Sequence, residues 1–487
     1  MSFKLHSFDQ ADRYRNYADW PEDYVTALNE LADQSPWRNH FHIEPKTGLI
    51  NDPNGFSFIN GEWQLFYQYY PFGPVHGLKS WYRLTSKDLI RWEEKGLALL
   101  PDNALDAHGA YSGSATADGD KLRLFYTGNV RDENWVRHPK QNTVTLDPET
   151  GALGQKELII DEIDQATDHF RDPMYFTAHG QSWLVIGGQR KADERGTLYL
   201  YQADPGNLDQ WTYHSELSIP QADSAYMFEC PNINQVDGKV FVTFCPQGID
   251  QDQLTYQNIY PNAYLVADAF TAEGKLENPG QLENLDYGFD VYASQLINAP
   301  DGRVLGVSWL GLPEIDYPTD QYGYQGALSL IKDFRIQDGR LYQYPVEETL
   351  ALRQDPQTFT DHIEVSQNTY EYAFDVASNK KASIQLYADT DKTHFVTLSI
   401  DTINGKIKLD RSEMGTIFAE DFGTSRTLDL AGQEKVTVNV FADTSVLEIF
   451  VNDGAYVMSS RIFTPSNQQT HIFAEGTDNN LVYFLHK

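Results

Sequence analysis

Three carboxylates stand in short, turn-rich motifs that suit acid, base or nucleophile chemistry. Asp52 lies in Asn-Asp-Pro-Asn-Gly, Asp172 in Phe-Arg-Asp-Pro and Glu229 in Phe-Glu-Cys-Pro. Each motif alone is also what a turn, a local ion pair or a strand end is made of. Together, in a chain rich in aromatic residues, they indicate a cleft that binds a sugar. In such clefts rings stack on the sugar faces, and paired carboxylates supply an acid and a nucleophile.

The strands that must position these residues begin near Trp37. Short alternating runs are separated by turn residues for roughly 300 residues, as at 62–68, 121–126 and 239–244. This pattern predicts an all-β architecture that hides its sheet edges in a propeller, a barrel or stacked sandwiches.

The two ends of the chain have different patterns. Residues 1–36 contain the one clear helix signal, in which Pro21 precedes an apolar stripe of Val25, Leu28, Leu31 and Ala32. Beyond about residue 345 the strands are plainer, as at 383–387 and 445–451. They predict a separate sandwich of about 130 residues.

The composition excludes several classes of partner. The 487 residues include 37 Lys and Arg against 70 Asp and Glu, which gives a net charge of −33. That charge argues against binding to nucleic acid or to an anionic membrane. With 41% hydrophobic and 13% aromatic residues, the chain has the material for a large core. We therefore expect a small molecule as the partner.

The cysteines and histidines give further expectations about the compartment and about metal binding. Cys230 and Cys245 form neither a disulfide framework nor a CxxC pair, which favours a reducing compartment. The chain has no signal-like or membrane-spanning apolar run, so we expect a cytoplasmic protein. Its 13 histidines show no HxH or HExxH spacing, so we expect no metal site.

Residues 40–55, His-Phe-His-Ile-Glu-Pro-Lys-Thr-Gly-Leu-Ile-Asn-Asp-Pro-Asn-Gly, resemble the opening signature of glycoside hydrolase family 32, the invertases and fructan hydrolases. The resemblance continues in order through residues 66–68, 86–92, 111–115, 170–173, 229–231 and 286–290. It covers nearly everything from Trp37 to Arg353 and extends more loosely beyond.

The resemblance implies an all-β fold, a five-bladed β-propeller followed by a C-terminal β-sandwich, with a short N-terminal helical leader. The expected boundaries are a leader at 1–36, a propeller with a central funnel at 37–345, a linker at 346–357 and a sandwich at 358–487.

The resemblance also assigns roles to the three acids. Asp52 is expected to be the nucleophile, Glu229 the general acid and base, and Asp172 a stabiliser that binds fructosyl hydroxyls. Asp52 must be ionised to attack, so we expect donors such as Asn51 to hold its pKa low. A nucleophilic mechanism retains configuration and sets the two working carboxyl groups about 5 to 5.5 Å apart.

Further residues are expected to form the substrate pocket. For any one aromatic a place in the core is an equal alternative, and Cys230 could be a buried filler or could tune Glu229. Arg171 could be a structural ion pair or could orient Asp172 and bind substrate. The expected substrate-binding residues are Leu49, Ile50, Asn51, Gln68, His76, Trp81, Tyr111, Ser112, Arg171, Cys230 and Trp309.

The leaving-group side departs from the common family pattern. Leu49-Ile50 stands where many relatives carry Trp-Met or Trp-Leu, and residues 77–83 and 131–140 are basic blocks that resemble those of bacterial sucrose-6-phosphate hydrolases. A chain of −33 would repel a doubly charged sugar phosphate, so binding needs a local cluster of positive charge. The candidates for phosphate contact are Lys79, Arg83, Arg137, His138 and Lys140, each of which could instead be a solvated surface charge.

These patterns lead to an expected function. It is a retaining β-fructofuranosidase that hydrolyses sucrose 6-phosphate to glucose 6-phosphate and fructose, without an organic cofactor. One alternative is an intracellular hydrolase of sucrose or short fructo-oligosaccharides, with or without fructosyl transfer. A remote alternative is a non-catalytic sugar-binding propeller.

Overall fold

The computed structural model describes residues 5, 7–204, 206–430, 435–465 and 468–486. Its N-terminal segment holds α1 (Gln10–Arg13), the 3-10 helix η1 (Tyr17–Asp19) and α2 (Glu22–Ala32). Leu28 and Ala32 are the buried residues of α2, which agrees with the predicted apolar stripe. No helix in the described ranges is long and apolar enough to cross a membrane.

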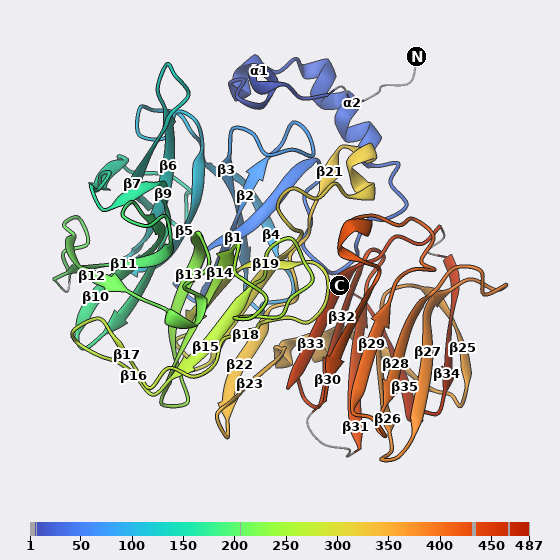
Figure 1. Cartoon of the computed structure of the whole chain (residues 1–487). Coiled ribbons are helices and arrows are strands. Elements are labelled where there is room, and N and C mark those ends of the chain that lie inside the picture. The colour runs from blue at the N-terminus through green and yellow to red at the C-terminus, as the bar shows by residue number, and fades with distance from the viewer. Residues whose placement is uncertain (1–4, 6, 205, 431–434, 466–467, 487) are drawn as a thin grey trace.

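The leader packs on the chain between the second and third strands. The Trp20 ring stacks on Phe72 with centroids 4.7 Å apart, and the Tyr17 hydroxyl donates to the Leu78 carbonyl at 2.8 Å. Figure 1 shows α1 and α2 over one end of the strand region.

Strands account for most of the rest of the chain. Those of residues 48–345 form five larger sheets of similar build and one two-stranded sheet, β16 (Ala269–Phe270) with β17 (Leu276–Glu277). The strands of each sheet follow one another along the chain. They are β1 (Gly48–Ile59), β2 (Glu62–Tyr70), β3 (Ser80–Ser86) and β4 (Glu93–Leu99); β5 (Ala110–Asp118), β6 (Lys121–Arg131), β7 (Arg137–Leu146) and β8 (Glu157–Ile160); β9 (Ala166–Ala178), β10 (Gln181–Arg190), β11 (Gly196–Ala203) and β12 (Thr212–Leu217); β13 (Met227–Val236), β14 (Lys239–Gln247), β15 (Ala263–Ala267) and β18 (Glu283–Asn284); and β19 (Val291–Asn298), β20 (Val304–Leu310), β22 (Lys332–Gln337) and β23 (Arg340–Pro345).

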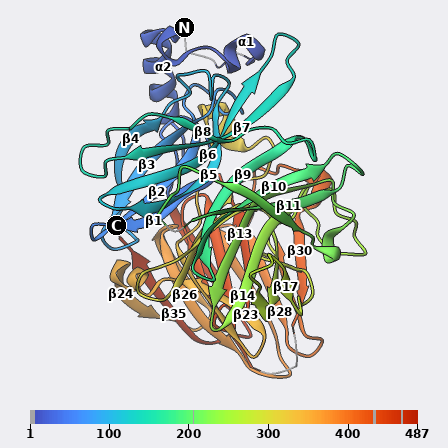
Figure 2. The same ribbon diagram turned by 90° about the vertical axis from the view of Figure 1, so that its left-hand side faces the viewer.

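The first strands of the five sheets contact one another in succession. β1 contacts β5, β5 contacts β9, β9 contacts β13, β13 contacts β19, and β19 contacts β1. The short strand β21 (Tyr324–Gln325) pairs in parallel with β1, which ties the end of this region to its beginning. A narrow cavity of about 20 Å³ is lined by residues of all five first strands. Residues of five sheets therefore line one small volume. Figures 1 and 2 show these sheets beside the C-terminal sheets from two directions.

Each of the five first strands has a break in register near that volume. The breaks lie between Ile50 and Pro53, between Ala110 and Gly113, at residues 172–173, between Glu229 and Asn232, and between Tyr292 and Gln295. Such bulges add residues to one strand and turn its side chains to new directions. Asp172, Cys230 and Ala293 adopt positive φ values of 66°, 48° and 48° at these points. The motif residues are thus aimed by local irregularities of otherwise regular strands.

The C-terminal region holds two six-stranded antiparallel sheets that share one hydrophobic core. One sheet has the order β24 (Arg353–Thr358), β35 (Asp478–Leu485), β26 (Tyr370–Val376), β31 (Val436–Ala442), β32 (Val446–Val451) and β33 (Tyr456–Arg461). The other has β25 (His362–Gln367), β34 (Gln468–Glu475), β27 (Lys381–Ala388), β28 (Val396–Asp401), β29 (Lys406–Asp410) and β30 (Ser425–Asp429).

The segment expected to be a linker, 346–357, has regular structure. It contains the 3-10 helix η4 (Glu347–Leu352) and most of β24, which pairs with β35. The C-terminal sheets thus begin at Arg353, because backbone pairing with the last strand orders a stretch whose polar sequence resembled a connection.

Buried charges join the C-terminal sheets to the five N-terminal ones. The His42 ring lies between Asp443 and Glu448, with Nδ1 and Nε2 each 3.0 Å from a carboxylate oxygen. Asp290 accepts from the Arg411 guanidinium at 3.0 Å and from the Arg461 backbone N–H at 2.7 Å. The acids of the 286–290 motif therefore serve this junction: Asp286 likewise accepts from Ser459.

The junction predicts a pH-dependent stability. Burial alone would lower the pKa of His42, but Asp443 and Glu448 raise it above its ordinary value. A raised histidine pKa stabilises the fold fully below about pH 6.5, and this contribution is lost as pH rises through the folded pKa. We expect His42→Gln to cost about 3 kcal/mol at pH 6 and markedly less at pH 9, in denaturant unfolding at both pH values.

His40→Gln is the matched control, because His40 lies in the same segment with an exposed side chain. An equal loss for His42→Gln at both pH values would contradict a protonated His42.

Candidate active site

Asp52, on β1, is held by a chain of side-chain donors. Its Oδ1 accepts from Asn51 Nδ2 at 3.0 Å and its Oδ2 accepts from the Ser112 hydroxyl at 2.5 Å. Gln68 connects these two donors, since its Oε1 accepts from the Asn51 amide and its Nε2 donates to Ser112. Lys79 Nζ donates to Asn51 Oδ1 at 2.5 Å. The orientation of Asp52 is therefore fixed from three strands.

Glu229, on β13, has donors on both carboxylate oxygens. Arg171 donates to Oε1 from Nε at 3.0 Å and from a terminal nitrogen at 2.6 Å. Gln247 and Tyr292 both donate to Oε2 at 2.6 Å. Its side chain is 16% exposed, so the carboxylate is fixed and still reachable from outside.

Asp172, on β9, is buried, whereas Asp52 and Glu229 are partly buried. Its Oδ2 accepts from the Cys230 backbone N–H at 3.1 Å, while its own N–H donates to Thr127. The Cys230 sulfur lies 3.5 Å from Asp52 Oδ2 and 3.7 Å from Asp172 Oδ2. One thiol therefore bridges two acids, and the three motif carboxylates share a single site.

Crowding and burial change the protonation of these acids. Burial raises the pKa of Asp52 above its ordinary value, although the Ser112 hydroxyl opposes the rise, and the Glu229 charge adds to it. Burial raises the pKa of Asp172 to about 7, against the opposing charge of Arg171. The expectation that a donor-rich turn holds the Asp52 pKa low is therefore wrong, because desolvation outweighs the hydrogen bonds.

The raised pKa of Asp172 predicts that its ionised carboxylate destabilises the folded state. A carboxyl whose pKa rises from 3.8 to about 7 stabilises the folded state only while protonated, so stability falls as pH rises between these values. We expect Asp172→Asn to raise the free energy of unfolding by about 2 kcal/mol at pH 8 and by less at pH 5. Chemical denaturation at the two pH values measures the difference. A variant that is less stable than the parent at pH 8 would contradict the raised pKa.

The expected substrate-pocket residues fall into two groups. Asn51, Ser112, Arg171 and Cys230 contact the acids directly, as described above. Gln68 reaches Asp52 only through Asn51 and Ser112. Leu49, Ile50, Trp81 and Trp309 are at most 1% exposed. Trp81 packs in the core and donates its indole N–H to the Tyr111 carbonyl at 2.9 Å, so it supports the strand that carries Tyr111 and Ser112.

His76 and Trp309 lie together at the edge of this group. The His76 side chain is exposed, and its ring is 6.2 Å from that of Trp309, edge to face. Trp309 also meets the Tyr292 ring, with centroids 6.3 Å apart. Its indole nitrogen is buried and has no hydrogen-bond partner among the residues described here.

Two of the five residues expected to contact phosphate are buried against protein groups. Burial lowers the pKa of Lys79 to about 7, while the Asp52 charge opposes this shift, so its ammonium belongs electrostatically to the Asp52 site. Arg83 is 4% exposed and donates to Gln64 and to the Pro148 carbonyl. No hydrogen bond joins Arg83 to the three acids within the described residues.

The other three lie on β7, on its two faces. His138 is 2.9 Å from Glu162, and Lys140 pairs with Asp161, so these two positive charges already have acidic partners. Arg137 points to the other face of the strand, because side chains alternate along it.

Several residues of the site carried no recognisable sequence motif. Gln247 and Tyr292 hold Glu229, and Thr127 holds the backbone of Asp172. Tyr292 stands two residues after the 286–290 motif, which is the one sequence signal that could have drawn attention to it.

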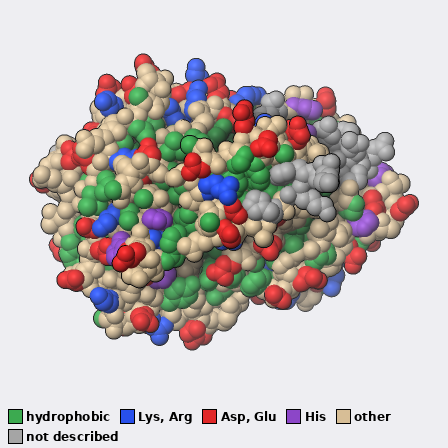
Figure 3. Space-filling view, turned by 90° about the horizontal axis from the view of Figure 1, so that it is seen from above, with side chains coloured by type: hydrophobic (Ala, Val, Ile, Leu, Met, Phe, Trp, Pro, Cys, Tyr) green, Lys and Arg blue, Asp and Glu red, His purple; other side chains and the backbone are tan. Residues whose placement is uncertain are grey.

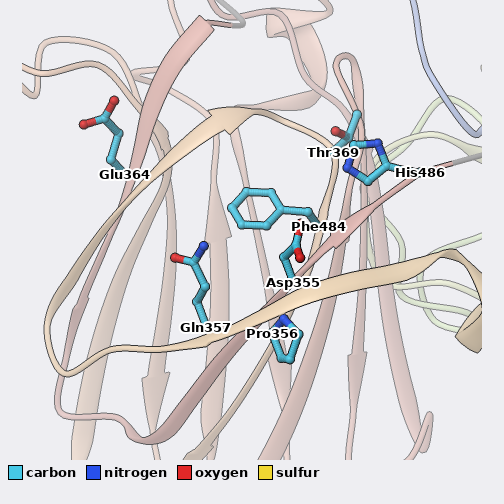
Figure 4. Close-up of a pocket in the computed structure, with 7 residues that line it drawn as sticks. All are labelled: Asp355, Pro356, Gln357, Glu364, Thr369, Phe484 and His486. Carbon is cyan, nitrogen blue, oxygen red and sulfur yellow. The ribbon is translucent and has the colours of Figure 1, made fainter.

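A larger cavity of about 780 Å³ lies in the C-terminal region. Figure 4 shows its two carboxylates, Asp355 and Glu364, on separate segments and well apart. Its lining residues are Asp355, Pro356, Gln357, Glu364, Thr369, Phe484 and His486. It lacks the convergence of acids and donors that marks the first site.

The fold and this site define a class of enzyme. An all-β chain that brings three carboxylates from separate sheets into one site has the arrangement of a glycoside hydrolase. Residues 42–345 match the model of the glycosyl hydrolases family 32 N-terminal domain, and residues 341–485 match that of the family 32 C-terminal domain. The chain belongs to glycoside hydrolase family 32.

Individual relatives agree with this assignment. The chain is 45% identical over 461 residues to a sucrose-6-phosphate hydrolase of Streptococcus mutans, covering 94% of this chain and 95% of the relative. A solved sucrose-6-phosphate hydrolase of Lactobacillus gasseri superposes with a TM-score of 0.94 at 37% identity, over 99% of both chains. A Bombyx mori family 32 β-fructofuranosidase, solved as a mutant with sucrose, superposes with a TM-score of 0.81 at 26% identity, over 96% of this chain and 99% of that chain.

Proposed function

We propose that this protein is a retaining β-fructofuranosidase that hydrolyses sucrose 6-phosphate to glucose 6-phosphate and fructose. The observation that carries the proposal is the shared site of Asp52, Asp172 and Glu229, each held by a different set of donors. The similarity to sucrose-6-phosphate hydrolases over nearly the whole chain supports the choice of substrate.

In the first step Asp52 attacks the anomeric carbon of the fructosyl unit. The bond from this carbon to the glucosyl oxygen breaks, and Glu229 gives its proton to that oxygen, so glucose 6-phosphate leaves. The donors Asn51 and Ser112 hold the attacking carboxylate in one orientation. Preorganisation of this kind lowers the cost of reaching the transition state.

In the second step water replaces the enzyme at the same carbon. Glu229, now a carboxylate, takes a proton from the water, and the hydroxide oxygen displaces Asp52 to release fructose. The donors Arg171, Gln247 and Tyr292 suit this anionic form of Glu229. Two displacements retain the configuration, and a mechanism of this kind needs its two carboxyl groups about 5 to 5.5 Å apart.

We propose supporting roles for the remaining pocket residues. Asp172, Gln68 and Arg171 bind fructosyl hydroxyls or orient the groups that do. Tyr111, Cys230 and the edge pair His76 and Trp309 line the pocket, while Leu49, Ile50 and Trp81 brace it from behind. The hydrogen bonds and burial of these residues support this division.

We propose that the five N-terminal sheets are the blades of a five-bladed propeller at 37–345, with the site in its central funnel. The contact of each first strand with the next, and of β19 with β1, supports this arrangement. The two six-stranded sheets would then form the C-terminal sandwich. The meeting of the two family models near residue 345 supports the border, with the leader at 1–36 preceding the propeller.

The substrate class bears on location. A sugar phosphate is charged and does not cross a lipid bilayer unaided, so an enzyme that uses it works where it is made. The free thiols Cys230 and Cys245 are compatible with a reducing compartment. We therefore propose the cytoplasm as its location.

A comparison of substrates tests the proposed specificity. We expect kcat/KM for sucrose 6-phosphate to exceed that for sucrose by about 100-fold, because charge-assisted contacts to phosphate are absent with sucrose. Steady-state kinetics on sucrose 6-phosphate, sucrose and 1-kestose measure this. Equal values for the first two would contradict the phosphate preference, and a higher value for kestose would favour a fructo-oligosaccharide hydrolase.

Two variants test the assigned roles. We expect Glu229→Gln to lower kcat/KM on sucrose 6-phosphate by about 10³-fold, and to lower kcat/KM for an activated aryl fructoside much less, since kcat/KM reports the first step and that leaving group needs no proton. Asp52→Asn should abolish turnover of both substrates. Retention of activity by Asp52→Asn would reopen the non-catalytic alternative, and an equal loss for Glu229→Gln on both substrates would contradict its role as the acid.

A further inference from the structure

Two arginines face each other at the end of the β6–β7 hairpin. In the register of these strands Arg131 stands directly opposite Arg137. Directly opposed side chains on antiparallel strands lie close together, and like charges there destabilise the pair. The fold therefore maintains a repulsive arrangement at this position.

No ion pair with an acidic side chain relieves the repulsion among the residues described. Neither arginine forms an ion pair within the described ranges, although 70 acidic residues are available in the chain. The Nε atoms of both are buried and lack a hydrogen-bond partner there. Arg131 is anchored by a bond to the Trp135 carbonyl at 2.8 Å, while the Arg137 side chain makes no hydrogen bond to any described residue.

The pair lies beside the groups that hold the acid of the proposed mechanism. Burial lowers the pKa of Arg137, and the charges of Arg171 and Arg131 lower it further, while Tyr111 and Asp168 oppose this. Arg171 is the residue that donates two hydrogen bonds to Glu229 Oε1. Asp168 is exposed and forms no ion pair with Arg137 among the residues described.

A further donor, His108, lies beside the two arginines. His108 accepts the Arg131 backbone N–H on Nδ1 at 3.1 Å, so in its neutral form its Nε2 carries the proton and is free to donate. The Tyr14 ring of the leader packs against the His108 and Trp135 rings, with centroids 6.1 and 4.9 Å apart. The leader thus closes one side of the positive cluster.

We propose that Arg131 and Arg137, with His108 beside them, bind the phosphate of the leaving group. The proposal rests on the proposed function and names the side chains that would give it specificity. Guanidinium groups match phosphate oxygens in pairs, and a dianion between two arginines converts their repulsion into attraction.

This assignment divides the basic residues of the chain. His138 and Lys140 occupy the opposite face of β7 and are paired with acids, and Lys79 serves the Asp52 site. Figure 3 shows acidic side chains spread over the face seen from above, with Lys and Arg scattered among them. Against such a background an unpaired arginine couple is a strong local exception.

The test uses Arg131→Gln and Arg137→Gln in the full chain. We expect each to lower kcat/KM on sucrose 6-phosphate by about 10- to 100-fold and to change that on sucrose by less than about 3-fold. Inhibition constants for glucose 6-phosphate, glucose and inorganic phosphate extend the test to binding alone. Retained activity on sucrose shows that each variant is folded.

Arg123→Gln is the matched control, because Arg123 lies on the same strand as Arg131 and is paired with Asp118 and Asp209. It should leave both activities unchanged. Wild-type inhibition should be strong with glucose 6-phosphate and weak with glucose, and both arginine variants should reduce that difference.

Distinct results overturn the two proposals. A wild type that prefers sucrose 6-phosphate, with arginine variants that keep the preference, overturns the phosphate site and leaves the substrate proposal intact. Loss of the preference in Lys140→Gln alone also overturns the phosphate site at Arg131 and Arg137 and leaves the substrate proposal intact. A wild type without the preference overturns the proposed substrate. The phosphate site is then tested by inhibition alone: glucose 6-phosphate should inhibit better than glucose, and Arg137→Gln should remove that difference. If either result fails, the phosphate site is overturned as well.

Discussion

The structure depends on keeping three carboxylates together in a partly buried volume. Asp52, Asp172 and Glu229 repel one another and lose solvation, and the raised pKa values of the two aspartates record that cost. The surrounding donors reduce the cost without removing it. Arg171 contacts one acid and neighbours another in sequence, and Lys79 acts on Asp52 through Asn51. The site is therefore held by the fold against its own electrostatics.

The architecture explains how the fold holds the three acids together despite their repulsion. Each acid sits on the first strand of a different sheet, at a bulge, and each of these strands pairs with the next strand of its sheet. The rigid sheets fix the positions and the bulges fix the directions of the side chains. Buried ion pairs such as Asp290 with Arg411 then fasten the C-terminal sheets to the fifth N-terminal sheet. These stabilising contacts lie away from the site, and they offset the unfavourable electrostatic energy of the three acids.

The sequence was sufficient for an all-β class of fold and for the family, because strand periodicity and short motifs are local signals. The roles that the resemblance gives to the three acids stay a prediction. The sequence could not reveal Gln247 or Thr127, which reach the site from neighbouring strands without a motif of their own. It grouped Lys79, Arg83, Arg137, His138 and Lys140 by charge alone. Separating them needed strand register and knowledge of which carboxylates lie opposite, and both are long-range properties. The direction of the Asp52 pKa was misjudged for the same reason, since desolvation comes from the whole fold.

The proposed mechanism requires a covalent bond between Asp52 and the fructosyl group. The most direct measurement is rapid acid quenching of the enzyme during turnover of sucrose 6-phosphate, followed by peptide mass spectrometry. We expect the added mass of one fructosyl group on the peptide that contains Asp52, and its absence in the Asp52→Asn variant. The same mass on the peptide that contains Glu229, or a first-formed fructose of inverted configuration, would contradict it.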